Sequence, residues 1–335
     1  TSHFGNPLFA APEFLNDKEY KNKVDVYSFG LLLFYICTDN EDFITKNQIV
    51  KQPLIPTRCH IYQNIYTQST KEDQRNRPNS IDLLFEIIYN ELFFPNTNKD
   101  EIYLLVNQIV TDINFKDQEI YKPFFIMKGI AYQEDFELAL ELIEESELQI
   151  LENELLCNEL ANIYMFDIKD YQKAFEYYSI ASDKGNYKAE NMIGIGYYTG
   201  VFGEKNFSKA LDIFDMIKDE DSDALNNYAY LLAFGSVDQQ DKEFEDDQKR
   251  LKTAVSFFHK AIKKSNKKES FINLGDIYSK TDIPKAIRFY IQACDFNFDI
   301  PYLRLADLCV INNGVINKKG ADYYYEKALK INKNL

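Results

Sequence analysis

The stretch KAFEYYSIASDKG at residues 173–185 carries the pattern on which the fold depends. Ala174 and Ala181 stand seven residues apart, with Phe175, Tyr177 and Tyr178 between them. Seven residues are about two turns of an α-helix, so the two alanines lie on one face. Because small side chains let two helices approach closely, the stretch predicts a helix that packs tightly against a helical neighbour.

Pairs of small residues recur through residues 119–335, one in each member of successive predicted helix pairs. Six pairs of small residues mark it: Gly129/Ala139, Ala161/Ala174, Gly194/Ala210, Ala229/Ala254, Gly275/Ala286 and Ala306/Ala321. A tyrosine follows the first member by three places in four of these pairs: Tyr132, Tyr164, Tyr197 and Tyr278. One helix pair cannot bury its apolar face alone, so repeated pairs must stack, with the tyrosines wedged between neighbouring pairs. The pattern predicts a mainly α protein containing an α-α solenoid of about six repeats.

Two stretches of this region resemble a known repeat family. Residues 173–178, with Ala181 and Gly185, resemble the Sel1 pattern K-A-x-x-W/Y-Y-x-x-A-A-x-x-G, and residues 194–200 resemble its L-G-x-x-Y-x-x-G. The resemblance extends to tetratricopeptide repeats, and the choice between the two subfamilies stays open. It implies a solenoid that binds proteins or peptides in the groove lined by its first helices.

Three asparagines are candidate peptide-binding residues of this groove. Asn158, Asn191 and Asn226 each stand three residues before the small residue of a first helix. An asparagine amide both donates to and accepts from a peptide backbone, which suits groove binding. The alternative is ordinary polar exposure. A second polar set directly follows the small residues: Asn162, Asp276 and Asp307.

Three motifs near the start of the chain resemble the C-terminal lobe of protein kinases. Residues 5–13, GNPLFAAPE, resemble G-T-P-x-[Y/F]-x-A-P-E, with Asn6 at the position of Thr. Residues 23–33 resemble a segment containing D-V-x-S-F-G, and residues 73–78 resemble D-P-x-x-R-P with Gln74 in place of Pro. This order implies that residues 1–93 are a truncated kinase C-lobe, and that residues 94–118 form a linker or connecting helix.

The resemblance also implies structural roles for three residues. Glu13 and Arg77 should form a largely buried ion pair, for which the alternative is an exposed pair worth about 0–1 kcal/mol. Asp25 should accept hydrogen bonds from the backbone of the catalytic loop, which this chain does not contain. An apolar run around residues 29–37 should therefore expose surface that the rest of the lobe would cover.

No catalytic residue of a kinase is found in the chain. None of His3, His60 and His259 lies in an H-R-D motif, and no G-x-G-x-x-G, P-loop or V-A-I-K is present. Phosphoryl transfer needs these parts, so we expect no cofactor in this chain, and ATP and Mg²⁺ only in an intact parent kinase. Because it begins within a motif, the chain is interpreted as part of a longer kinase. The alternative is a non-catalytic repeat adaptor with a vestigial lobe.

Charge and cysteine content narrow the class of partner and the compartment. The chain has 53 acidic and 38 basic residues and a net charge of −15, and we expect no basic stripe. This charge argues against nucleic acid and anionic membranes as partners. Its five cysteines are far apart and in no C-x-x-C pair, as is typical of a reducing cytoplasmic protein. The longest apolar run, residues 29–37, falls well short of the roughly 20 residues that span a bilayer.

Overall fold

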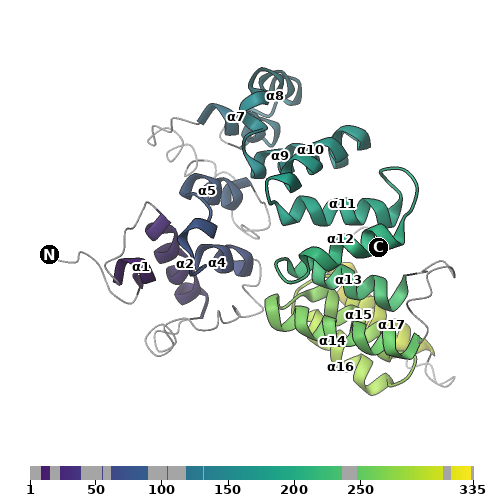
Figure 1. Ribbon diagram of the computed structural model, residues 1–335. Coiled ribbons are helices and arrows are strands. Elements are labelled where there is room, and N and C mark those ends of the chain that lie inside the picture. Colours follow the sequence, from purple (N-terminus) through teal and green to yellow (C-terminus); the bar gives the residue numbers. More distant parts are fainter. Residues whose placement is uncertain are drawn as a thin grey trace. The chain divides into compact units, whose positions relative to one another are not determined.

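The computed structural model describes residues 9–15, 23–38, 55, 62–89, 104, 118–130, 132–235, 247–311 and 318–332 (Figure 1). Within these ranges the chain is helical and contains no β-strand. Contacts divide it into two compact units: the first comprises Thr1–Ile55 and Ile61–Asn186, and the second Pro56–His60 and Tyr187–Leu335. No helix in the described ranges is long and apolar enough to cross a membrane.

The first unit contains the helices that precede residue 187. They are α1 (Pro12–Leu15), α2 (Lys23–Thr38), α4 (Gln63–Ser69), the short η3 (Gln74–Asn76), α5 (Ser80–Tyr89), α7 (Gln118–Met127), α8 (Phe136–Ile150), α9 (Glu154–Asn162), its π-helical continuation η5 (Ile163–Ile168) and α10 (Tyr171–Asp183). The second unit contains α11 (Tyr187–Thr199), α12 (Phe207–Ile217), α13 (Ser222–Phe234), α14 (Asp247–Ser265), α15 (Lys268–Tyr278), α16 (Ile283–Cys294), α17 (Ile300–Ile311) and α18 (Lys318–Ile331).

From α7 onward, consecutive helices pack as pairs, as the repeated small residues predicted. The pairs are α7/α8, α9/α10, α11/α12, α13/α14, α15/α16 and α17/α18. In four of the pairs the second helix follows a capping residue four positions before its marker alanine, the second member of the small-residue pair, and a side-chain oxygen of the cap accepts from a backbone N–H of the first turn. These capping residues are Asp135, Asp170, Asn206 and Asp282.

Small marker residues lie where the two helices of a pair touch. Ala161 and Ala174 are fully buried in the α9/α10 pair. A Cβ added to Gly194 would lie 2.5 Å from a ring carbon of Phe214, and one added to Gly275 would lie 2.3 Å from a ring carbon of Tyr290. The aromatic residue four places after the marker alanine of the second helix therefore packs directly on the backbone of the first helix.

Within the first unit, α5, which ends before the predicted boundary at residue 93, shares a core with α7, which begins at the predicted boundary at residue 118. The Phe85 ring of α5 lies 5.2 Å from that of Tyr121 and 5.8 Å from that of Phe124, both on α7. Asp82 of α5 accepts hydrogen bonds from Tyr121 Oη (2.7 Å) and from Nδ2 of Asn153, the N-cap of α9 (3.2 Å). The predicted boundaries at 93 and 118 stay predictions, because residues 90–103 and 105–117 lie outside the described ranges.

Candidate functional site

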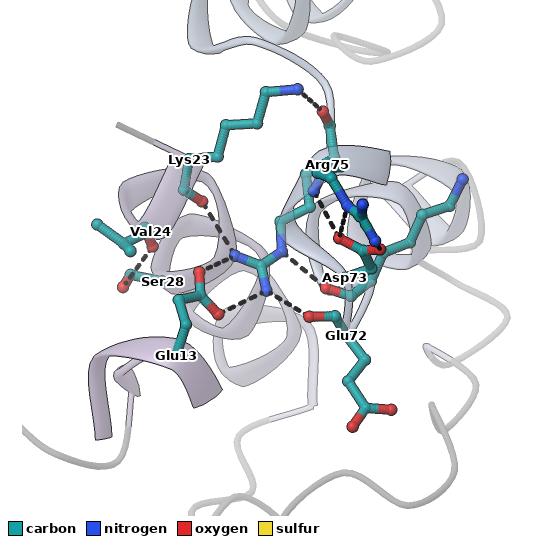
Figure 2. A network of polar contacts seen from close by, with 9 residues as sticks. Glu13, Lys23, Val24, Ser28, Glu72, Asp73 and Arg75 are labelled. Carbon is teal, nitrogen blue, oxygen red and sulfur yellow. Dashed lines mark hydrogen bonds and ion pairs between the residues drawn. The ribbon is translucent and has the colours of Figure 1, made fainter. Parts of the chain in front are cut away.

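Arg77 is the centre of a buried polar network in the first unit (Figure 2). Its Nη1 donates to Glu13 Oε1 at 2.5 Å and its Nη2 donates to Glu13 Oε2 at 3.0 Å, so the pair is bidentate. The Arg77 side chain is fully buried and that of Glu13 is 7% exposed. The structure thus places the A-P-E glutamate and the R-P arginine in contact, although 64 positions separate them in the sequence.

Every N–H of the Arg77 guanidinium has an acceptor. Besides the two bonds to Glu13, Nε donates to the carbonyl oxygen of Lys71 (2.7 Å) and Nη2 to that of Glu72 (3.1 Å). Nη1 also donates to the carbonyl oxygen of Lys23 (3.3 Å), at the start of α2. The guanidinium carbon lies 4.6 Å from the centre of the Tyr27 ring. One side chain therefore connects α1, the start of α2 and the segment before η3.

The pKa of Glu13 reflects this pairing. Burial raises the pKa of the carboxyl, but the hydrogen bonds from Arg77 and from the backbone, together with the Arg77 charge, outweigh burial and hold it below its ordinary value. A lowered carboxyl pKa means that the pair contributes its full stability above the unfolded-state pKa. That contribution is lost as the pH falls through the folded-state pKa.

One face of α2 is apolar and exposed. Its other face is buried through Val26, Tyr27, Leu31 and Phe34, whereas Phe29, Leu32 and Ile36 are 37%, 44% and 69% exposed. Asp25, which begins the same stripe at α2's first turn, is exposed and has no hydrogen-bond or ion-pair partner among the described residues. A helix with apolar residues on both faces is normally covered on both, so this stripe is a surface that no described residue covers.

The candidate groove asparagines are buried, which corrects the expectation that they line an open surface. Asn158, Asn191 and Asn226 are 3%, 7% and 5% exposed. Asn226 Oδ1 accepts from Ser270 Oγ (2.8 Å) and Asn273 Nδ2 (3.2 Å). These two partners lie on the first helix of the next repeat, so this amide joins neighbouring helices instead of facing a peptide.

The other two asparagines differ in the hydrogen bonds that their side chains make. Asn191 Oδ1 accepts from Asn227 Nδ2 at 2.9 Å, which links α11 to α13 in the same way. Asn158 Nδ2 donates to Glu159 Oε1 at 3.2 Å, but its Oδ1 is buried and has no hydrogen-bond partner among the described residues. The helical spacing correctly placed these residues on one face, but it could not tell the face towards the next repeat from the face towards solvent.

The repeats contain buried tyrosine hydrogen bonds that the spacing of small residues does not predict. Tyr178 Oη donates to Asn162 Oδ1 (2.7 Å), and Tyr290 Oη donates to Asp276 Oδ1 (2.6 Å). In each case the acceptor directly follows the small residue of the first helix. Burial raises the pKa of the Tyr290 phenol, and its bond to Asp276 raises it further.

A comparison of repeats would have revealed these bonds. A polar residue after the first marker occurs where the packed aromatic residue is tyrosine: Asn162 with Tyr178, Asp276 with Tyr290, and Asp307 with Tyr325. Where the aromatic residue is Phe214 or Phe258, the corresponding residue is Ile195 or Tyr230, without a carboxylate or amide. The acceptor and the phenol are thus present together or absent together.

We therefore expect Phe214→Tyr to destabilise the second unit by about 1–2 kcal/mol, because its phenol would be buried beside Ile195 without an acceptor. Ile195→Asp would supply the acceptor, although it costs stability by itself because Ile195 packs against this core. Urea denaturation of the two single variants and the double variant should give a favourable coupling free energy. Strict additivity would contradict the pairing rule.

Repeat tyrosines stack with lysines of the partner helix and also pack between neighbouring pairs, as expected: Tyr278 contacts both the core formed by α13, α14 and α15 and the core formed by α15, α16 and α17. Lys285 Nζ lies 3.8 Å from the Tyr278 ring centre and Lys209 Nζ lies 4.1 Å from that of Tyr197. In each case the lysine directly precedes the marker alanine of the second helix. The K-A dipeptide therefore closes its own helix pair through a cation–π contact.

Comparison with known proteins identifies the repeats. A family model described as Sel1 repeat matches residues 156–186, 188–216, 222–266 and 272–295. These four segments, which coincide with the pairs α9/α10 through α15/α16, are Sel1 repeats. A solved Sel1 repeat protein from Oxalobacter formigenes has the same fold at 16% identity and a TM-score of 0.54, covering 70% of this chain and 99% of that protein. The fold is thus a Sel1-type helical-repeat solenoid.

Similarity to curated proteins covers a shorter part of the chain, and these relatives are kinases. The chain is 33% identical over 95 residues to a probable serine/threonine-protein kinase of Dictyostelium discoideum, covering 26% of this chain and 10% of that protein. It is 33% identical over 115 residues to protein kinase C-like 1 of Saccharomyces cerevisiae, covering 30% of this chain and 10% of that protein. The chain thus spans about a tenth of the length of these curated relatives.

Proposed function

We propose that this chain is a fragment of a cytoplasmic protein kinase, in which the C-terminal part of the kinase domain is joined to Sel1 repeats that form a scaffold for protein or peptide partners. The observation that carries the proposal is the buried bidentate pair between Glu13 and Arg77, which stand at the A-P-E and R-P positions of the kinase motifs. The partial similarity to kinases supports the same assignment. In this proposal the parent phosphorylates protein serine, threonine or tyrosine, and the repeats bring its substrates or assembly partners to it.

The proposal requires a further segment of the parent protein to cover the exposed stripe of α2. Asp25, Phe29, Leu32 and Ile36 form a surface on which the upstream half of a kinase lobe would pack, with Asp25 accepting from its catalytic loop. ATP and Mg²⁺ would then be bound by upstream residues and not by this chain. The repeats would function through protein contacts, with neither nucleic acid nor membrane as a partner.

The test is the N-terminus of the endogenous product, determined by 5′-end mapping of the transcript together with mass spectrometry of the protein. An upstream segment containing the strand lysine, H-R-D and D-F-G is the expected result, and a phosphotransfer assay on that product would follow. Translation starting close to Thr1 would overturn the kinase proposal and leave a repeat adaptor without catalysis.

A double substitution on α2 provides a second test. Leu32→Glu with Ile36→Glu should change the stability of the present chain by no more than about 0.5 kcal/mol, because both side chains are exposed in it. In the longer product the same pair would bury two charges under the upstream half and abolish phosphotransfer. Ile291→Glu, at a residue of α16 that is 51% exposed, is the matched control and should be silent in both proteins. An active double variant of the longer product would show that nothing covers α2.

A further inference from the structure

Helix α8 exposes a straight stripe that combines leucines with carboxylates. Leu138, Glu141, Glu145 and Leu148 follow one another at intervals of three, four and three residues and are all exposed. Leu148 is 82% exposed and Leu138 is 42% exposed, whereas Ala139, Ile143 and Ile150 of the same helix are buried. The stripe is therefore the outer face of a helix whose inner face is already packed.

The segment of sequence that contains this face has charge of one sign. Residues 129–168 contain eleven acidic residues and no lysine or arginine. Within the described ranges, Glu141 and Glu145 take part in no ion pair. An exposed helix face with two leucines and unpaired carboxylates fits an occupant that is basic and helical.

Helix α14, in the second unit, has the opposite charge to α8. Residues 248–268 contain eight lysines and arginines and no acidic residue, so the expectation that the chain has no basic stripe is wrong at this helix. Lys249, Lys252, Ser256, His259 and Lys263 are exposed at intervals of three, four, three and four residues.

Two of the other lysines of α14 are already engaged. Lys260 and Lys264 both contact Asp219, the first through its carboxylate and the second through its backbone carbonyl. Lys249, Lys252 and Lys263 have no carboxylate partner among the described residues. The exposed stripe of α14 therefore has unpaired positive charge, as that of α8 has unpaired negative charge.

We propose that the α8 face of one chain packs along the α14 face of a second copy. Alternating steps of three and four residues keep a stripe straight along a helix, which lets two helices lie side by side at a shallow angle. At about 1.5 Å per residue, Lys252 and Lys263 are spaced like Leu138 and Leu148, so the lysine stems would cover the leucines and their ammonium groups would reach inward to Glu141 and Glu145, which lie between them. Two such contacts related by a two-fold axis close a dimer, in which each chain contributes both faces.

This assembly has a defined salt dependence. The whole chain has a net charge of −15, so two copies repel one another except where α8 meets α14. Surface ion pairs weaken once the screening length falls to a few ångströms. Self-association should therefore be measurable at low ionic strength and decrease strongly when salt is added. The proposal is independent of the kinase relation, because only the two helix faces enter it.

Sedimentation velocity of the purified chain tests the proposal directly. Between about 5 and 200 μM protein at low salt, we expect a dimer that increases with concentration, with association at least about tenfold weaker at about 0.5 M salt. A monomer throughout this range would overturn the proposal and leave the two faces to other proteins. A compact monomer whose sedimentation varies with salt but not with concentration would also overturn it.

Charge reversal identifies the faces. Glu141→Lys with Glu145→Lys should abolish the dimer, and so should Lys252→Glu with Lys263→Glu. Each variant alone has two faces of the same sign, but an equimolar mixture of the two variants restores both contacts and should dimerise again. The matched controls make the same charge changes at other exposed residues, with Glu204→Lys and Glu326→Lys for the first variant and Lys280→Glu and Lys330→Glu for the second.

Circular dichroism melting separates loss of association from loss of folding, and all the variants should melt as the parent monomer does. Dimers that persist in both reversal variants would overturn the assignment to α8 and α14. Failure of the mixture to dimerise would do so as well, because the pairing predicts rescue by opposite charge.

Discussion

Replacing Arg77 by alanine is expected to lower the free energy of unfolding of the first unit by about 3–5 kcal/mol. The substitution would leave the Glu13 carboxylate buried without its counter-ion and remove the donors to the carbonyl oxygens of Lys71, Glu72 and Lys23. Water does not reach these groups in the folded chain, since the Arg77 side chain is fully buried. The loss should therefore approach the full penalty of an unpaired buried charge.

Arg75 provides a matched control two residues away. It also pairs with a carboxylate, that of Asp73 at 2.7 Å, but its side chain is 85% exposed. Arg75→Ala should therefore change the free energy of unfolding by at most about 1 kcal/mol. Urea denaturation, with hydrogen exchange of the α2 amides to assign the transition to the first unit, measures both variants. Equal effects of the two substitutions would show that Arg77 does not hold α1 to the segment before η3.

The helix pairs could be predicted from sequence because their signal is local. Ala174 and Ala181 on one face, or Gly275 and the alanine that follows it in the next helix, specify close approach through residues within a few turns of each other. The capping residues have the same local origin, since Asp170 accepts from the N–H of Lys173 only three residues away.

Long-range partners were harder to predict for a physical reason. Helical periodicity assigns Asn226 to a face, but the same face can border solvent or the next repeat, and the acceptor role towards Ser270 depends on that packing. The pair between Glu13 and Arg77 was expected only because a family resemblance supplied a contact across 64 positions. Nothing local to either residue indicates the other.

Gly275→Ala is expected to lower the free energy of unfolding of the second unit by about 3 kcal/mol, the upper part of the range for overpacking. Alanine is normally the better helix former by about 1 kcal/mol, so helix propensity alone predicts the opposite sign. The added Cβ would lie 2.3, 2.6 and 2.8 Å from three ring carbons of Tyr290. Tyr290 is 1% exposed and its hydroxyl is bonded to Asp276, so the ring has little freedom to move aside.

Tyr290→Leu provides the test of this cause. The substitution costs stability by itself, but it removes the ring that meets the new methyl group. Urea denaturation of both single variants and the double variant should give a double variant more stable than additivity predicts by at least about 1 kcal/mol. Ala161 stands opposite Tyr178 at the equivalent place in the α9/α10 pair, so alanine is compatible with the repeat itself. A stable Gly275→Ala variant would therefore mean that α15 and α16 can separate to the spacing of that pair, and that the glycine does not set their distance.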